Sequence, residues 1–113
     1  MRLKEITEKL NLKVRCGEHL LEREVKRGYA SDLMSDVIAH SSEGDLWVTL
    51  QVHVNAVAVA SMRDLACILI IGGREPQEET VAKAKEEDIP ILLSELTAFE
   101  MIGRLYKLGI PGI

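Results

Sequence analysis

The feature that most constrains the fold is an unbroken apolar run from Leu65 to Ile71, which ends at Gly72-Gly73. A strand with one face in water alternates apolar and polar residues, whereas a run without alternation is typical of a strand covered on both faces. The run is far too short to span a bilayer. It therefore predicts a central strand of a sheet that is buried on both sides.

The segments around this run follow a strand-then-helix order. Strands are predicted at 46–50 and 89–93. Three helices are predicted: one at 55–62, one that begins at Pro76, and one at 97–108 that ends at Gly109. Each link has about a dozen or more residues of helical character, which is the crossover that parallel strands need. Residues 46–60 also satisfy a period of two, so a longer strand there is the open alternative.

The first third of the chain is less regular. It predicts a helix at 2–10, a strand at 12–16, an extended segment at 24–30, and then a helix capped by Ser31 whose apolar side carries Leu33, Met34, Val37 and Ile38. Asp32 and Asp36 fit capping and the helix dipole better than a pair of catalytic carboxylates. We therefore expect one α/β domain over residues 1–113, with a mainly parallel sheet flanked by helices and antiparallel or edge elements from the first third.

Composition narrows the function classes. The net charge is -4, from 14 basic and 18 acidic residues spread along the chain, so no positive field is present to bind nucleic acid. The N-terminus is charged from Arg2 and lacks the apolar core of a secretory signal, which predicts a cytoplasmic protein that does not bind membranes.

Cys16 and Cys67 form no CxxC pair and are interpreted as core residues, with a disulfide as the less favoured alternative. Trp47 is interpreted as a core or interface anchor.

Motifs for catalysis, metals or cofactors are missing from the sequence. There is no P-loop string and no GxSxG elbow, and the three histidines form no HxH or HxxxH pair for zinc. The Gly72-Gly73-Arg74 loop leads into a helix start, where free amides can bind an anion. Because Glu75, Glu78 and Glu79 would satisfy the dipole and repel phosphate, a structural turn is favoured.

A ligand site is predicted where the parallel strands end, since open α/β sheets bind their ligands at the carboxyl edge. The candidate residues from three loops are His53, Asn55, Gly72, Gly73, Arg74 and Thr97. We expect His53 and Asn55 to hydrogen-bond, the glycines to permit close backbone approach, and Arg74 and Thr97 to approach an anionic group. None of them is assigned a catalytic role.

A homodimer is also predicted. Residues 54–62 are apolar almost all round, and a helix of that kind must be covered on more than one side. A domain of 113 residues rarely covers such a helix alone, so a partner subunit is the expected cover.

Three stretches together resemble one known family. They are Gly28-Tyr29-Ala30-Ser31-Asp32-Leu33-Met34-Ser35-Asp36, Ile70-Ile71-Gly72-Gly73, and Ile89-Pro90-Ile91-Leu92 before Thr97. The chain resembles the DRTGG domain family over nearly its whole length. Val52-His53 stands where the family has an Asp-Arg pair, and Ile71 stands where a Thr would precede the glycines.

The resemblance implies a regulatory or dimerising module with a fold similar to the N-terminal domain of HPr kinase. Relatives accompany CBS domains in regulated pyrophosphatases, and short free-standing versions are similar to proteins encoded near iron-only hydrogenase genes. We therefore expect a non-catalytic regulatory or ligand-sensing and dimerisation module that binds a small molecule or nucleotide or docks on a protein partner, and that is associated with hydrogenase or redox metabolism.

The alternative is a small enzyme or phosphate-handling protein that uses His53, Arg74 and Thr97 from three loops. A dry, convergent pocket at the strand ends would favour this alternative. A strand end filled by the chain itself would count against it.

Overall fold

A single mixed sheet organises the chain, as seen in a computed structural model that describes residues 1–112. Within those residues, the sheet order is β1-β5-β4-β3-β2, and the strands are β1 (Lys13–Cys16), β2 (Arg27–Ala30), β3 (Asp45–Thr49), β4 (Cys67–Ile70) and β5 (Ile91–Leu93). The helices are α1 (Leu3–Lys9), α2 (Met34–His40), α3 (Val54–Met62), α4 (Glu78–Glu86) and α5 (Ala98–Leu108), with a short 3-10 turn, η1, at Glu18–Leu20.

The predicted parallel arrangement is confirmed. Strands β2, β3, β4 and β5 are parallel neighbours, and in the centre Leu69 pairs with Val48 on one side and with Leu92 on the other. β1 pairs antiparallel with β5, so the first third of the chain supplies an antiparallel edge strand, as expected. The fold is α/β.

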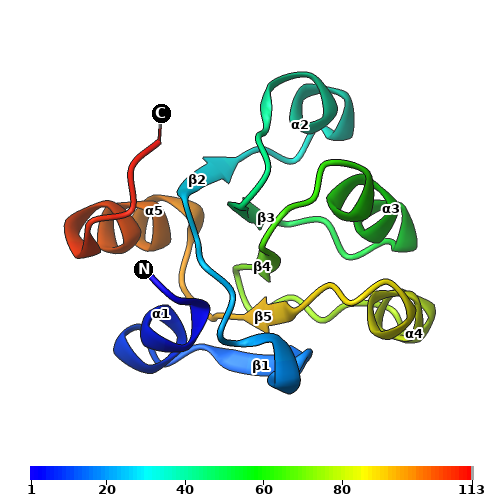
Figure 1. The fold of residues 1–113 in the computed structure, drawn as a ribbon, viewed down its shortest axis with the longest axis horizontal. Coiled ribbons are helices and arrows are strands. Elements are labelled where there is room, and N and C mark those ends of the chain that lie inside the picture. The colour runs from blue at the N-terminus through cyan, green and yellow to red at the C-terminus, as the bar shows by residue number, and fades with distance from the viewer. Residues whose placement is uncertain (113) are drawn as a thin grey trace.

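Both faces of the sheet are covered by helices, which explains the apolar run in β4. Figure 1 shows α2, α3 and α4 on one face and α1 and α5 on the other. Ile68 and Ile70 pack in the core under α3 and α4, whereas Cys67, Leu69 and Ile71 pack in the core under α1 and α5. Every side chain of β4 therefore enters a core, and no polar alternation can appear in its sequence.

The predicted core residues lie inside. Trp47 is fully buried, and its indole Nε1 donates to the Ser31 carbonyl at 2.8 Å. Cys16 and Cys67 are buried in the two different core clusters, on opposite faces of the sheet.

Two predicted helix starts are wrong by two residues each. α2 begins at Met34 with Leu33 as its N-cap, because the Ser31 hydroxyl accepts from the Leu33 amide in a tight turn before the helix. α4 begins at Glu78 rather than at Pro76, because the Gln77 backbone is extended and its amide donates to the Val52 carbonyl. The alternative of one long strand over 46–60 is also wrong, since α3 forms from Val54.

The premise behind the predicted dimer face is corrected too. Figure 1 shows α3 lying between α2 and α4 over the sheet, so neighbours within the same chain cover it on several sides. Ala56, Val57, Val59 and Ala60 are buried in this way, while Met62 at the end of the helix is exposed. The apolar composition of α3 therefore needs no second subunit.

Across residues 1–112, none of the helices has the length and apolar character needed to cross a membrane.

Candidate functional site at the carboxyl edge of the sheet

The loops that follow β2, β3, β4 and β5 all emerge at one edge of the sheet, because these strands are parallel. α4 leaves the end of β4 toward one face, and α5 leaves the end of β5 toward the other (Figure 1). Adjacent strands whose connections part in this way usually open a ligand crevice between them. The β4–β5 position is therefore the first place to look for a site.

This crevice is closed by the chain itself. The Gly72 amide donates to the Leu96 carbonyl at 2.8 Å, and the Gly73 amide donates to the Ser94 carbonyl at 2.9 Å. Gly73 has a φ of 72°, and a Cβ at this residue would lie 2.5 Å from a carboxylate oxygen of Glu95. The glycine pair thus uses its amides to join two loops, in agreement with the structural turn that the neighbouring acids favour.

An open hollow lies beside this closed junction, at the ends of β3 and β4. It has a volume of about 240 Å³ and is lined by Asp32, Leu50, Gln51, Val52, His53 and Arg74. The Arg74 guanidinium donates to the Leu50 carbonyl at 2.7 Å, which orders the arginine at the rim. His53 and Arg74, two of the six predicted site residues, are brought together here.

His53 is the N-cap of α3, and its Nδ1 accepts from the Asn55 amide at 3.1 Å. An accepting Nδ1 carries no proton, so the neutral ring has its hydrogen on Nε2 and can donate from that atom. The cap thus fixes both the position of the imidazole and its tautomer.

Asp32 is the site residue that sequence reasoning assigned to another role. Its Oδ1 accepts from the Thr49 hydroxyl at 3.0 Å and from the Leu50 amide at 2.7 Å, and its carbonyl accepts from Gln51 Nε2 at 2.7 Å. It therefore ties the β2 loop to the β3 loop instead of capping α2. The signal in the sequence was its position directly after a strand, which is the same signal that selected His53.

A second hollow shares Asp32 and extends toward the start of α5. It measures about 220 Å³ and is lined by Ala30, Ser31, Asp32, Val48, Thr49, Ile71, Ala98 and Ile102. Asp32 thus lines two neighbouring hollows along the carboxyl edge of the sheet.

The other predicted residues are more scattered. Gly73 and Arg74 face a third hollow of about 320 Å³ on the β1 side, together with Ser94, Glu95 and Lys13. Asn55 is exposed in the first turn of α3 and contributes its backbone amide to the His53 cap. Thr97 is the N-cap residue of α5 and lies outside the lining of all three hollows.

The thiols are poor nucleophiles. Burial raises the pKa of Cys67 to about 12, and burial also raises the pKa of Cys16. Both side chains are therefore protonated near neutral pH, which suits core residues. Among residues 1–112, no three His, Cys, Asp or Glu side chains lie close enough together to hold a metal ion.

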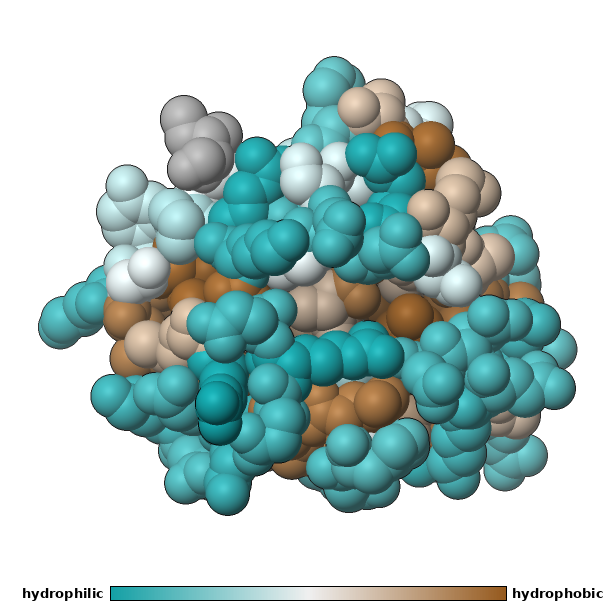
Figure 2. All heavy atoms as spheres, viewed as in Figure 1, coloured by the Kyte–Doolittle hydropathy of each residue, from teal (hydrophilic) through white to brown (hydrophobic). Residues whose placement is uncertain are grey.

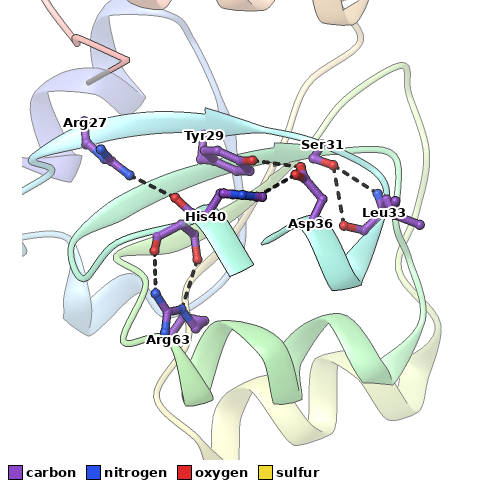
Figure 3. A network of polar contacts seen from close by, with 8 residues as sticks. Arg27, Tyr29, Ser31, Leu33, Asp36, His40 and Arg63 are labelled. Carbon is purple, nitrogen blue, oxygen red and sulfur yellow. Dashed lines mark hydrogen bonds and ion pairs between the residues drawn. The ribbon is translucent and has the colours of Figure 1, made fainter. Parts of the chain in front are cut away.

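A separate polar network fastens α2 to the sheet, as Figure 3 shows. The Tyr29 hydroxyl donates to Asp36 Oδ2 at 2.8 Å, and His40 Nδ1 lies 3.0 Å from Asp36 Oδ1. At the end of α2, Arg63 donates to the Ser41 carbonyl at 2.6 Å. These contacts join elements of the fold, and their residues do not line the three hollows described above.

The Tyr29–Asp36 hydrogen bond gives this network a defined pH range. The bond lowers the pKa of Asp36 from its usual 3.8 and raises the pKa of Tyr29 from its usual 10.0. A lowered acid pKa adds stability above 3.8 that is lost as the pH falls through the folded-state value. A raised tyrosine pKa adds stability below 10.0 that is lost as the pH rises through the folded-state value.

We expect Tyr29→Phe to lower the unfolding free energy across the plateau between these two limits and to have little effect beyond either one. Urea unfolding of both proteins across the pH range measures the difference. A difference that stays constant into strong acid would contradict this assignment of the Asp36 pKa.

Comparison with known proteins agrees with this architecture. The family model of the DRTGG domain matches residues 5–108. The chain therefore belongs to the DRTGG domain family. No curated protein sequence matches it.

One solved structure gives a direct view of the same fold. The CBS and DRTGG domains of the regulatory region of Clostridium perfringens pyrophosphatase, complexed with the activator diadenosine tetraphosphate, align with a TM-score of 0.71 and 17% sequence identity. The alignment covers 97% of this chain and 47% of that chain, so this chain spans about half the length of its neighbour. At this identity the likeness is evidence for the fold.

Proposed function

We propose that this chain is a non-catalytic regulatory module that senses a small phosphorylated ligand of the nucleotide class at the carboxyl edge of its sheet. The observation that carries the proposal is the convergence of His53, Arg74 and Asp32 on one hollow. These three residues come from the ends of three parallel strands, where such folds place their ligands.

The chemistry of the hollow suits such a ligand. Arg74 and the Nε2 of His53 supply donors for an anionic group, and charge-assisted bonds of this kind are the strongest that side chains make. Leu50 and Val52 supply an apolar wall for a ring. Each of the two hollows that share Asp32 is alone smaller than the roughly 300–1,000 Å³ of small-molecule sites, but together they reach that range.

Sensing fits this edge better than catalysis does. The alternative enzyme requires His53, Arg74 and Thr97 to converge, and Thr97 lies outside the hollow of the other two. The β4–β5 crevice, where a reaction could be kept dry, is filled by hydrogen bonds between the two loops. These observations support a binding role with no catalytic residue.

The setting of the module is part of the same proposal. The similar pyrophosphatase region is described as regulatory and was solved with an activator that is a dinucleotide, which supports a nucleotide ligand here. We include a homodimer and an association with hydrogenase or redox metabolism, as the family resemblance implies, together with a protein partner and a cytoplasmic location.

A thermal-shift screen against mononucleotides, dinucleotides and sugar phosphates tests the ligand class. A ligand that binds only the folded state must raise the apparent melting temperature. For a ligand found in this way, we expect His53→Ala and Arg74→Ala each to weaken binding by about tenfold or more, since each removes a charge-assisted or oriented donor. Calorimetric titration gives the dissociation constants.

Lys85→Ala is the matched control, because Lys85 is an exposed cation in the last turn of α4 and does not line the hollow. It should leave the affinity unchanged. Folding of each variant is checked by circular dichroism. If the folded His53 and Arg74 variants bind as tightly as the parent, the site is elsewhere.

A further inference from the structure

The outward face of α5 carries more apolar surface than the core of the chain can cover. Met101 and Leu105 point into the core, yet Phe99 is 91% exposed, Tyr106 is 71% exposed and Ile102 is 41% exposed. Together with Gly103, these exposed residues follow the spacing of one helical stripe, which we call the α5 stripe: Phe99, Ile102, Gly103 and Tyr106. Figure 2 shows apolar surface on the side of the molecule where Figure 1 draws α5.

Within residues 1–112, no close contact requires a glycine at position 103, in the middle of the stripe. A Cβ at this position would meet no described atom within 4 Å, so the fold leaves room for a larger residue. Glycine inside a helix costs about 1 kcal/mol relative to alanine. The missing side chain leaves room for another helix to approach this face closely.

The stripe also borders an apolar depression. Ile102 and Tyr106 line a hollow of about 70 Å³ with Leu105, Ile110 and residues 28–30 of β2. The exposed Phe99 ring lies two helical turns away from Tyr106 on the same stripe. A projecting ring and a receiving hollow therefore lie at opposite ends of one helix.

We propose that the α5 stripe is the interface of a homodimer, in which it packs antiparallel on the stripe of a second copy of this chain. A two-fold axis between Ile102 and Gly103 places residue 99 of each copy opposite residue 106 of the other. Each Phe99 then enters the hollow beside the other copy's Tyr106, and the glycines meet at the centre. The self-complementary order of ring, small residue and hollow is what selects a second copy as the occupant.

The charges along the flank of the stripe agree with this orientation. Glu100 lies near the start of α5, and Arg104 and Lys107 lie toward its end, with Arg104 Nε 2.8 Å from Glu100 Oε2 within the chain. In the antiparallel pair, the acidic end of each helix lies against the basic end of the other. Such rim charges add little affinity, but they favour this orientation.

This inference rests on the dimer included in the proposed function and names its surface, while ligand binding at the β3–β4 hollow stands independently of it. Sedimentation or light scattering from micromolar to sub-millimolar concentration measures the mass. We expect the parent chain to be a dimer and Phe99→Glu and Ile102→Glu to be folded monomers.

Met62→Glu is the matched control, since Met62 is the large exposed apolar residue of α3 and is 61% exposed. This variant should stay dimeric. A parent chain that is monomeric throughout would overturn the dimer itself. A dimer that survives Phe99→Glu, or that dissociates with Met62→Glu instead, would overturn the α5 interface and keep the dimer.

Two further variants separate an interface role from a structural one. Gly103→Ala should raise the melting temperature of the isolated subunit, through better helix propensity, while weakening the dimer. Ile102→Cys should give a covalent dimer on oxidation, because the axis brings the two residues close, and Met62→Cys should not. An alanine variant that strengthens both the fold and the dimer would count against close helix contact at Gly103.

Discussion

Replacing Asp45 with alanine should lower the free energy of unfolding by about 3 kcal/mol, because it breaks an ion pair whose carboxylate is fully buried. Asp45 has no exposed surface, and its two carboxylate oxygens accept from Arg27 at 2.9 and 3.2 Å. One of these oxygens also accepts from the Ser42 amide at 2.7 Å. The bond to Asp45 raises the pKa of Arg27, so the guanidinium stays charged and loses its partner in the variant.

Urea unfolding measures this loss, and Glu43→Ala is the control. Glu43 lies two residues before Asp45 in the chain. Its carboxylate is 3.7 Å from Lys26 Nζ, but both side chains are largely exposed. An exposed pair contributes roughly 0–1 kcal/mol, so the control should differ little from the parent. Equal effects of the two substitutions would mean that burial of Asp45 is not what makes its pair important.

Gly17→Ala should cost about 3 kcal/mol as well, for a steric reason. Gly17 has a φ of 89°, which side chains rarely adopt, and a Cβ there would lie 2.7 Å from the Pro90 Cα. Backbone atoms cannot move aside as the end of a flexible side chain can. The variant must therefore part the end of β1 from the segment that leads into β5.

Gly109→Ala separates the two contributions to this cost. Gly109 has a φ of 110°, but no atom of residues 1–112 lies within 4 Å of a Cβ placed there. This variant should lose about 1 kcal/mol from the backbone conformation alone. Thermal unfolding of both variants gives the comparison, and a Gly17 variant no less stable than the Gly109 variant would exclude the predicted clash.

The parallel core of the fold could be predicted because β4 is buried on both faces, and this burial determines the residue types of its sequence. A strand that enters two cores carries no polar residue, so the run from Leu65 to Ile71 was unmistakable, and the helix lengths around it required crossovers. The starts of α2 and α4 could not be predicted to the residue. They depend on hydrogen bonds that the Leu33 amide donates to the Ser31 hydroxyl and the Gln77 amide donates to the Val52 carbonyl. The pattern of apolar residues along the sequence does not predict such contacts.

The sequence predicted where the candidate site lies in the fold better than it predicted which residues line it. Parallel strands bring His53 and Arg74 to one edge, and that follows from topology alone. Asp32 was assigned to a helix cap because the sequence cannot reveal that Thr49 and Leu50 would bind its carboxylate. The apolar composition of α3 was mistaken for an open face, because neighbouring helices on the same side of the sheet are invisible in a linear pattern.

The two hydrogen bonds from Gly72 and Gly73 to the 94–96 loop also connect the end of β4 to the segment that leads into α5. Arg74 at the rim of the hollow follows Gly73 directly, and α5 begins two residues after Leu96. The same two hydrogen bonds therefore lie between the rim of the hollow and the first turn of α5. In the proposed function, a ligand that displaces Arg74 would act on the start of α5 through these two hydrogen bonds. The proposed ligand hollow and the helix of the proposed dimer interface are thus joined by one short segment of backbone.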